Sequence, residues 1–160
     1  MSYYNHFLKF GVNKTMFFDV QKRIWSHGPQ MSHRRRLHGC AFVPETNKTR
    51  GQVIVVAGKH SEDTVESLDV VSKEWKTIGK IPFPNETSEY NAIRSPALID
   101  ANSSEFILYS IGGWSSLQGY GPLKGIYGLT HYYEWKHVQN LAMKRAFHTS
   151  VMLRDILVCP

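Results

Sequence analysis

The sequence predicts an all-β protein built from repeated units of short antiparallel strands. Aromatic residues make up 12% of the 160 residues, and 12 glycines and 7 prolines favour many short strands and turns over long helices. Apolar runs of four to six residues, bounded by turn residues, recur in GQVIVVAGK at 51–59 and EFILYSIGGW at 105–114. Because no stretch keeps a helical period, almost no helix is expected.

Tryptophans mark the repeat. MFFDVQKRIW ends at Trp25 and ESLDVVSKEW ends at Trp75, and each has an Asp six residues before its Trp. A third copy, YGLTHYYEW, ends at Trp135 and keeps the aromatic character but not the Asp. The Trp spacings are 50 and 60 residues, and two insertions, FPNETSEYN at 83–91 and a Gly-rich loop at 113–125, account for the longer one. A regular spacing of this kind predicts a repeat protein.

Between the tryptophans, an apolar strand ends twice in small residues. One run ends at Ala57-Gly58 and the other at Gly112-Gly113, and further strands are expected at 39–43, 95–100 and 148–153. Four short antiparallel strands in about 50 residues are typical of a propeller blade. The predicted division is an N-terminal segment 1–14 and a repeat region 15–160, made of a partial unit 15–25, units 26–75 and 76–135, and a partial unit 136–160.

This ordered set resembles kelch repeats, in which an apolar strand ends in Gly-Gly and is followed by an aromatic residue and a Trp. The run from Ile107 to Gly113 with Trp135 matches, and the run from Val53 to Gly58 with Trp75 matches with Ala57 in place of one glycine. The aromatic position is expected at Phe18, Leu68 and Tyr127. The resemblance implies kelch-like β-propeller blades, each a four-stranded antiparallel sheet, in an incomplete ring of about three blades.

An arginine and a histidine recur three residues apart, in RRRLHG at 34–39 and KRAFHT at 144–149. Arg35 and Arg145 each stand ten residues after a Trp. Because a guanidinium can reach several backbone carbonyls at once, both are expected to tie neighbouring blades together. The predicted structural positions of the repeat are therefore Trp25, Arg35, Gly58, Trp75, Gly112, Gly113, Trp135 and Arg145.

Charge and composition exclude some partners. The net charge is +6, but RRR at 34–36 is the only tight basic cluster, so nucleic acid is not an expected partner. No apolar run has the length of a membrane helix and no signal peptide is recognised, so the chain as written is expected in the cytoplasm. Four Asn-x-Ser/Thr sequons leave open a fragment of a secreted, extracellular parent. Cys40 and Cys159 lie in apolar runs and are expected to be buried, inert thiols.

No metal site, cofactor or catalytic centre is expected. The eight histidines are scattered, and no nucleophile signature or phosphate-binding glycine loop is present. His131 beside Tyr132 and Tyr133 is similar to copper sites of galactose-oxidase-like kelch enzymes. An ordinary strand with exposed aromatic residues is the preferred interpretation, and the oxidase is kept as an alternative.

The expected function is therefore a non-enzymatic, protein-binding adaptor module. Its candidate binding residues lie in two loops that follow the glycines, at 59–65 and 113–125, and are His60, Ser61, Trp114, Ser115 and Tyr120. Trp114 either contacts a partner or folds back onto its own blade. An incomplete ring leaves apolar faces bare, so self-association that completes the propeller is also expected. A non-functional truncated gene product is a further alternative.

Overall fold

The computed structural model describes residues 11–47, 50–61, 63–82, 97–98, 105–115, 121–148, 150–153 and 156–158. The all-β prediction is confirmed: throughout these ranges the regular elements are strands, every pairing is antiparallel, and no sheet closes on itself. The expected insertion at 83–91, Tyr120 and Cys159 lie outside the described residues.

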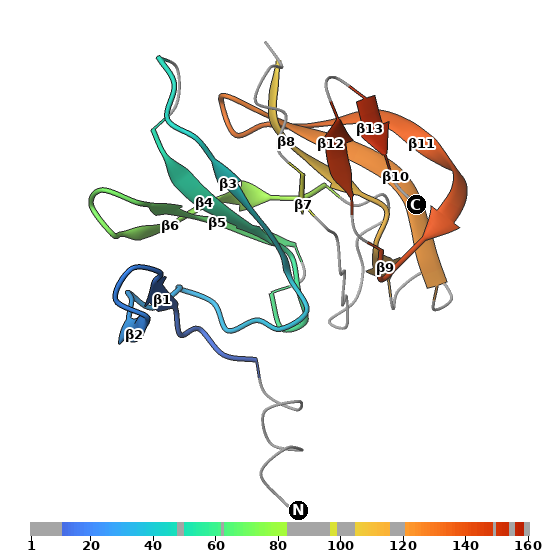
Figure 1. Cartoon of the computed structure of the whole chain (residues 1–160). Helices are drawn as coiled ribbons and strands as arrows, with labels where there is room; N and C mark the ends of the chain where they lie inside the picture. The colour runs from blue at the N-terminus through green and yellow to red at the C-terminus, as the bar shows by residue number, and fades with distance from the viewer. Residues whose placement is uncertain are drawn as a thin grey trace, which may run out of the picture.

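Two sheets form the body of the molecule (Figure 1). In the first, neighbouring strands follow in sequence order: β3 (Gly39–Val43), β4 (Gln52–Val56), β5 (Thr64–Asp69) and β6 (Trp75–Lys80). The second repeats this order with β7 (Ala97–Leu98), β8 (Phe106–Ile111), β10 (Gly121–Thr130) and β11 (Trp135–Arg145), while β9 (Trp114–Ser115) pairs with the start of β10.

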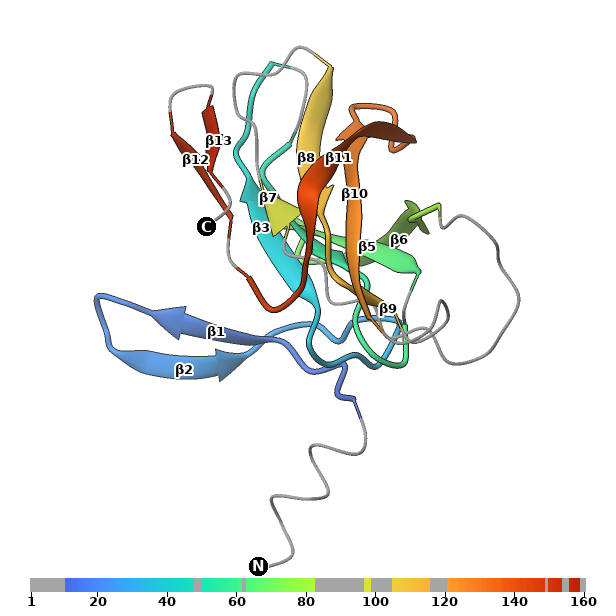
Figure 2. The same ribbon diagram turned by 90° about the vertical axis from the view of Figure 1, so that its right-hand side faces the viewer.

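Two separate hairpins accompany the sheets. The first is β1 (Met16–Asp19) with β2 (Ile24–His27), and the second is β12 (Val151–Leu153) with β13 (Ile156–Val158). The hairpins lie apart from each other in both views of the molecule (Figures 1 and 2).

A hairpin whose second strand carries a Trp at or near its start occurs three times with nearly the same geometry. The Trp lies opposite an apolar residue in the pairs Phe18–Trp25, Leu68–Trp75 and Leu129–Trp135. Two residues before each Trp the backbone is left-handed, with φ of 56° at Arg23, 57° at Lys73 and 62° at Tyr133. The expectation that Tyr127 holds the third aromatic position was wrong, because Tyr127 lies opposite His137 and the paired residue is Leu129.

The turn of each hairpin is fixed by a side-chain oxygen that accepts backbone N–H groups. Asp69 Oδ1 accepts from Val71 N at 2.8 Å and from Ser72 N at 2.9 Å. In the copy without an Asp, Thr130 Oγ1 accepts from Tyr132 N at 3.3 Å and from Glu134 N at 3.1 Å. Short polar side chains stabilise turns in this way, so a threonine replaces the aspartate here.

The main hydrophobic core lies between the two sheets. β4 and β5 carry mostly buried residues, as expected of strands covered on both faces. The core residues are Val43, Ile54, Val56, Ala57, Val65 and Ile81 from the first sheet and its flanks, and Ile107, Leu108 and Leu129 from the second. Trp135 packs against this cluster from the edge strand β11.

Candidate functional site

Arg35 is buried inside the first sheet. Its side chain is fully buried and donates to Ala57 O at 2.7 Å, to Thr64 O at 3.2 Å and to Thr64 Oγ1 at 3.1 Å. It also pairs with the Glu66 carboxylate. These partners belong to the unit 26–75 that contains Arg35 itself. The predicted tie to a neighbouring unit is therefore wrong for Arg35, because its guanidinium holds together strands β4 and β5 of its own sheet.

Arg145 is arranged differently. Its carbonyl oxygen accepts a hydrogen bond from Gly113 N at 2.9 Å, and so attaches the end of β11 to the residues that follow β8. Its guanidinium forms no hydrogen bond or ion pair with a residue that the structure describes. Burial and then the Arg145 charge lower the pKa of His148, whose ring lies beside Gly112. The contact between segments exists here, but the backbone of Arg145 makes it.

The two small-residue pairs have the same backbone conformation. Ala57 has φ 56° and Gly112 has φ 55°, while Gly58 has φ 102° and Gly113 has φ 114°. A Cβ at Gly58 would come within 2.9 Å of Arg36 O, and one at Gly112 within 2.8 Å of Arg145 O. The left-handed backbone favours glycine at these positions, although Ala57 adopts it too, and at Gly58 and Gly112 the neighbouring carbonyl oxygens leave no room for a Cβ.

The three repeat tryptophans have three different environments. Trp75 Nε1 donates to Thr15 Oγ1 at 3.1 Å and to Pro29 O at 3.2 Å, which fixes the chain on either side of the β1–β2 hairpin. Trp135 packs on the core between the sheets. Trp25 is 65% exposed and contacts the Phe18 ring at a centroid distance of 4.9 Å. An indole connects neighbouring units at Trp75 and Trp135, whereas Trp25 faces outward.

The described residues of the predicted binding loops differ in burial and in their contacts. Ser61 is only 4% exposed, and its hydroxyl donates to Arg34 O at 2.9 Å, so it stabilises its own turn. His60 is exposed in the same turn with φ 79°. Trp114 in β9 contacts the ring of Phe147 at 5.7 Å. Phe147 belongs to the unit 136–160 and not to the unit of Trp114 itself, so this contact is not the predicted fold-back onto its own blade. Ser115 follows Trp114 in β9.

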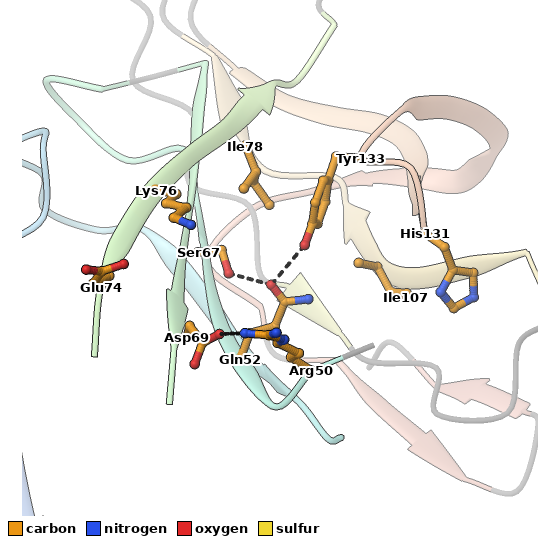
Figure 3. A pocket seen from close by; sticks show the side chains of 10 residues that line it. All are labelled: Arg50, Gln52, Ser67, Asp69, Glu74, Lys76, Ile78, Ile107, His131 and Tyr133. Atoms are coloured by element: carbon orange, nitrogen blue, oxygen red, sulfur yellow. Dashed lines mark hydrogen bonds and ion pairs between the residues drawn. The ribbon is translucent and has the colours of Figure 1, made fainter. Parts of the chain in front are cut away.

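A polar pocket lies beside the core residues Ile78 and Ile107 (Figure 3). It has a volume of about 440 Å³. Strands β4, β5 and β6 form one side and the turn between β10 and β11 forms the other. The lining residues are Arg50, Gln52, Ser67, Asp69, Glu74, Lys76, Ile78, Ile107, His131 and Tyr133.

A hydrogen bond joins the two sides of this pocket. The hydroxyl of Tyr133 donates to Gln52 Oε1 at 3.3 Å, and Ser67 Oγ donates to the same oxygen (Figure 3). The amide nitrogen of Gln52 then points into the pocket. Gln52 is 5% exposed, so these contacts hold its amide in one orientation. Tyr133 has a left-handed backbone with φ 62°, and its ring extends from the turn toward Gln52.

The charged side chains of the pocket fall into two groups. Arg50 lies 3.6 Å from Asp69. The pKa of Asp69 is lowered by the N–H groups of Ser72 and Val71, so this carboxylate is ionised at neutral pH. Lys76 and Glu74 form no ion pair with any residue in the described ranges. These two side chains remain available to charges on a partner.

His131 does not gather metal ligands around it. Tyr132 is 86% exposed, and Tyr133 is directed to Gln52. Both ring nitrogens of His131 are shielded from solvent without a hydrogen bond to a described residue. Within the described ranges, no three His, Cys, Asp or Glu side chains come together as a metal site requires. No observation here favours the copper-enzyme alternative.

The sequence did not predict the pocket, and it gave the wrong burial for one cysteine. Cys40 is a free, exposed thiol, because its position in the edge strand β3 faces solvent. Gln52 and Tyr133 are 81 residues apart, and no local pattern indicates that they meet. The one available signal is that Tyr133 stands two residues before a repeat Trp, in a turn position that is left-handed in all three copies.

No protein-family model matches the sequence, and no curated protein matches it either. In the part of the chain that the structure describes, no helix has the length and apolar character needed to cross a membrane.

Proposed function

We propose that the chain is a non-enzymatic binding module made of kelch-like repeats, and that a polar segment of a protein partner binds in the pocket between its two sheets. The observation that carries this proposal is the Tyr133–Gln52 hydrogen bond, which joins the two sheets and orients polar groups around the pocket.

Repeated geometry supports the kelch-like part of the proposal. The expected motif places glycines at a strand end and a Trp on the last strand of each unit. Ala57-Gly58 and Gly112-Gly113 have matching φ angles, and Trp75 and Trp135 both begin the edge strand of an antiparallel sheet, in which four strands follow in sequence order, β3-β4-β5-β6 and β7-β8-β10-β11. A propeller blade has this strand order.

The chemistry of the pocket supports binding over catalysis. Its volume of about 440 Å³ lies in the range of sites that hold a few side chains. Asp69 caps its own turn and pairs with Arg50, while Tyr133 donates to Gln52. These groups are used to hold the pocket in shape. Lys76 and Glu74 can pair with charges of a partner, and the Gln52 amide can donate to a carbonyl.

Site-specific crosslinking tests the proposal. A photoreactive phenylalanine analogue is placed at Glu74, which lines the pocket and leaves the Tyr133–Gln52 hydrogen bond intact, or at Tyr132, which is 86% exposed. We expect a protein partner to be crosslinked from position 74 and not from position 132, and its yield to fall in the Lys76→Glu variant. Equal crosslinking from both positions would contradict a partner site in the pocket.

A further inference from the structure

The β1–β2 hairpin corresponds to the last two strands of the β3–β6 sheet. Phe18 lies opposite Trp25 as Leu68 lies opposite Trp75, and the turns share the left-handed residue before the Trp. In the sheet, β5 also pairs with β4 along its other edge. No described strand pairs with the other edge of β1. That edge presents unpaired N–H and C=O groups, and an isolated hairpin is only marginally stable in water.

The same hairpin exposes an apolar face. Met16 is 43% exposed, Phe18 45% and Trp25 65%. Phe18 and Trp25 are directly opposed, and Met16 is two residues from Phe18, so all three belong to one face. At the two equivalent positions, Trp75 and Trp135 contact a neighbouring unit. An exposed apolar face of this kind marks an interaction surface.

The β12–β13 hairpin corresponds to the first two strands of the same sheet. β12 follows the Arg145–His148 pair as β3 follows Arg35 and His38. β13 consists of three successive apolar residues, Ile156–Val158, which is the pattern of a strand covered on both faces, as β4 is. No described strand pairs with the outer edge of β13.

We propose that β13 of one copy of this chain pairs with β1 of a second copy, which gives a four-stranded sheet in the order β12-β13-β1-β2. This order repeats β3-β4-β5-β6. Within one chain the two hairpins lie apart in both views (Figures 1 and 2), so the pairing is proposed between two copies. Two such exchanges are related by the two-fold symmetry of common dimers.

The internal sheet also specifies the register. Val43 lies opposite Gln52, and Leu153 lies opposite Ile156. Leu157 therefore occupies the place of the residue after Gln52. That residue, Val53, lies opposite Leu68, whose counterpart in the first hairpin is Phe18. The proposed dimer thus has Leu157 of one copy opposite Phe18 of the other, and Val158 opposite Phe17.

Crosslinking between two differently labelled chains tests this register. In a Cys40→Ser, Cys159→Ser background, one chain carries Phe18→Cys and the other Leu157→Cys, and the mixture is treated with a short bismaleimide. We expect a covalent dimer that contains one copy of each chain. Val20→Cys is the matched control, because Val20 is 76% exposed at the tip of the β1–β2 turn. Paired with Leu157→Cys, it should give little product.

Two further measurements decide the remaining cases. The unsubstituted 160-residue chain should sediment as a dimer at micromolar concentration. If the first pair of variants folds poorly, the crosslinking is repeated with Phe17→Cys in one chain and Val158→Cys in the other. A sedimenting monomer overturns the proposal, as does a dimer that crosslinks at neither pair. A crosslinked monomer from one chain carrying both Phe18→Cys and Leu157→Cys also overturns it, because the strands would then pair within one chain.

Discussion

The guanidinium of Arg35 lies against the carboxylate of Glu66 inside the β3–β6 sheet, and both side chains are completely shielded from solvent. Glu66 also accepts hydrogen bonds from Ser32 N at 2.7 Å and from His33 N at 3.4 Å. Through this pair, the segment before β3 is attached to β5. The pair is therefore central to the first sheet, although its residues are 31 positions apart.

Arg35→Lys should lower the free energy of unfolding by about 2 kcal/mol. A lysine keeps the charge but cannot reach two carbonyls, a hydroxyl and a carboxylate with one ammonium group. Chemical denaturation at neutral pH measures the effect. Arg145→Lys is the matched control and should change the free energy by less than about 0.5 kcal/mol, since the backbone of Arg145 makes its contact. Equal losses in the two variants would mean that the Arg35 contacts contribute little.

Gly113→Val should destabilise the fold by about 2 kcal/mol or more. Gly113 has φ 114°, a conformation that a β-branched residue adopts only with strain, and its N–H donates to Arg145 O. Gly121→Val is the control, because nothing lies within 4 Å of a Cβ placed there. The two melting temperatures provide the comparison, and a Gly113→Val protein that melts together with the Gly121→Val protein would argue against a glycine requirement.

The sequence predicted the all-β class because that class depends on local chemistry. Strand length, the glycines at strand ends and the Trp at the start of an edge strand can be recognised within a few residues of each other. Arg35 was also recognised from its spacing to Trp25. The hydrogen-bond partners of Arg35 could not be predicted, because they depend on how the strands are arranged in the sheet.

The pocket could not be predicted, because it depends on how the sheets pack against each other. Gln52 begins a core strand and Tyr133 lies in a distant turn of the repeat, and neither position indicates that the two side chains meet. The turn capped by Thr130 shows a different limit. A hydroxyl can replace the aspartate of the other copies, so loss of the Asp from the pattern did not mean loss of the turn.

Trp75→Phe should destabilise the chain by about 1 to 2 kcal/mol. The indole N–H of Trp75 bonds to Thr15 and Pro29, and phenylalanine leaves both acceptors without it. Trp25→Phe is the control and should be nearly neutral in monomeric protein, because Trp25 is 65% exposed. Amide hydrogen exchange adds a local readout: protection should fall in β1 and β2 of the Trp75 variant while β4 and β5 stay protected. Unchanged exchange in β1 and β2 would show that Trp75 does not hold the hairpin.

Because of Glu66, the free energy of unfolding should depend on pH in the acid range. Burial by itself raises the pKa of Glu66, but hydrogen bonds from Arg35 and from Ser32 N–H, together with the charges of Arg35 and His33, outweigh it and lower the pKa below its usual 4.5. The unfolded chain therefore binds a proton at higher pH than the folded chain. The stabilising contribution is complete above the usual value and is lost as pH falls through the lowered, folded value.

Glu66→Gln should accordingly be less stable than the original protein at about pH 7 and should lose less stability on acidification to about pH 3. Asp69, whose pKa is also lowered, titrates in both proteins, so the difference between their two curves isolates Glu66. Denaturant titrations at a series of pH values give both curves. Parallel curves over this range would mean that the Arg35–Glu66 pair does not control the acid stability of the sheet.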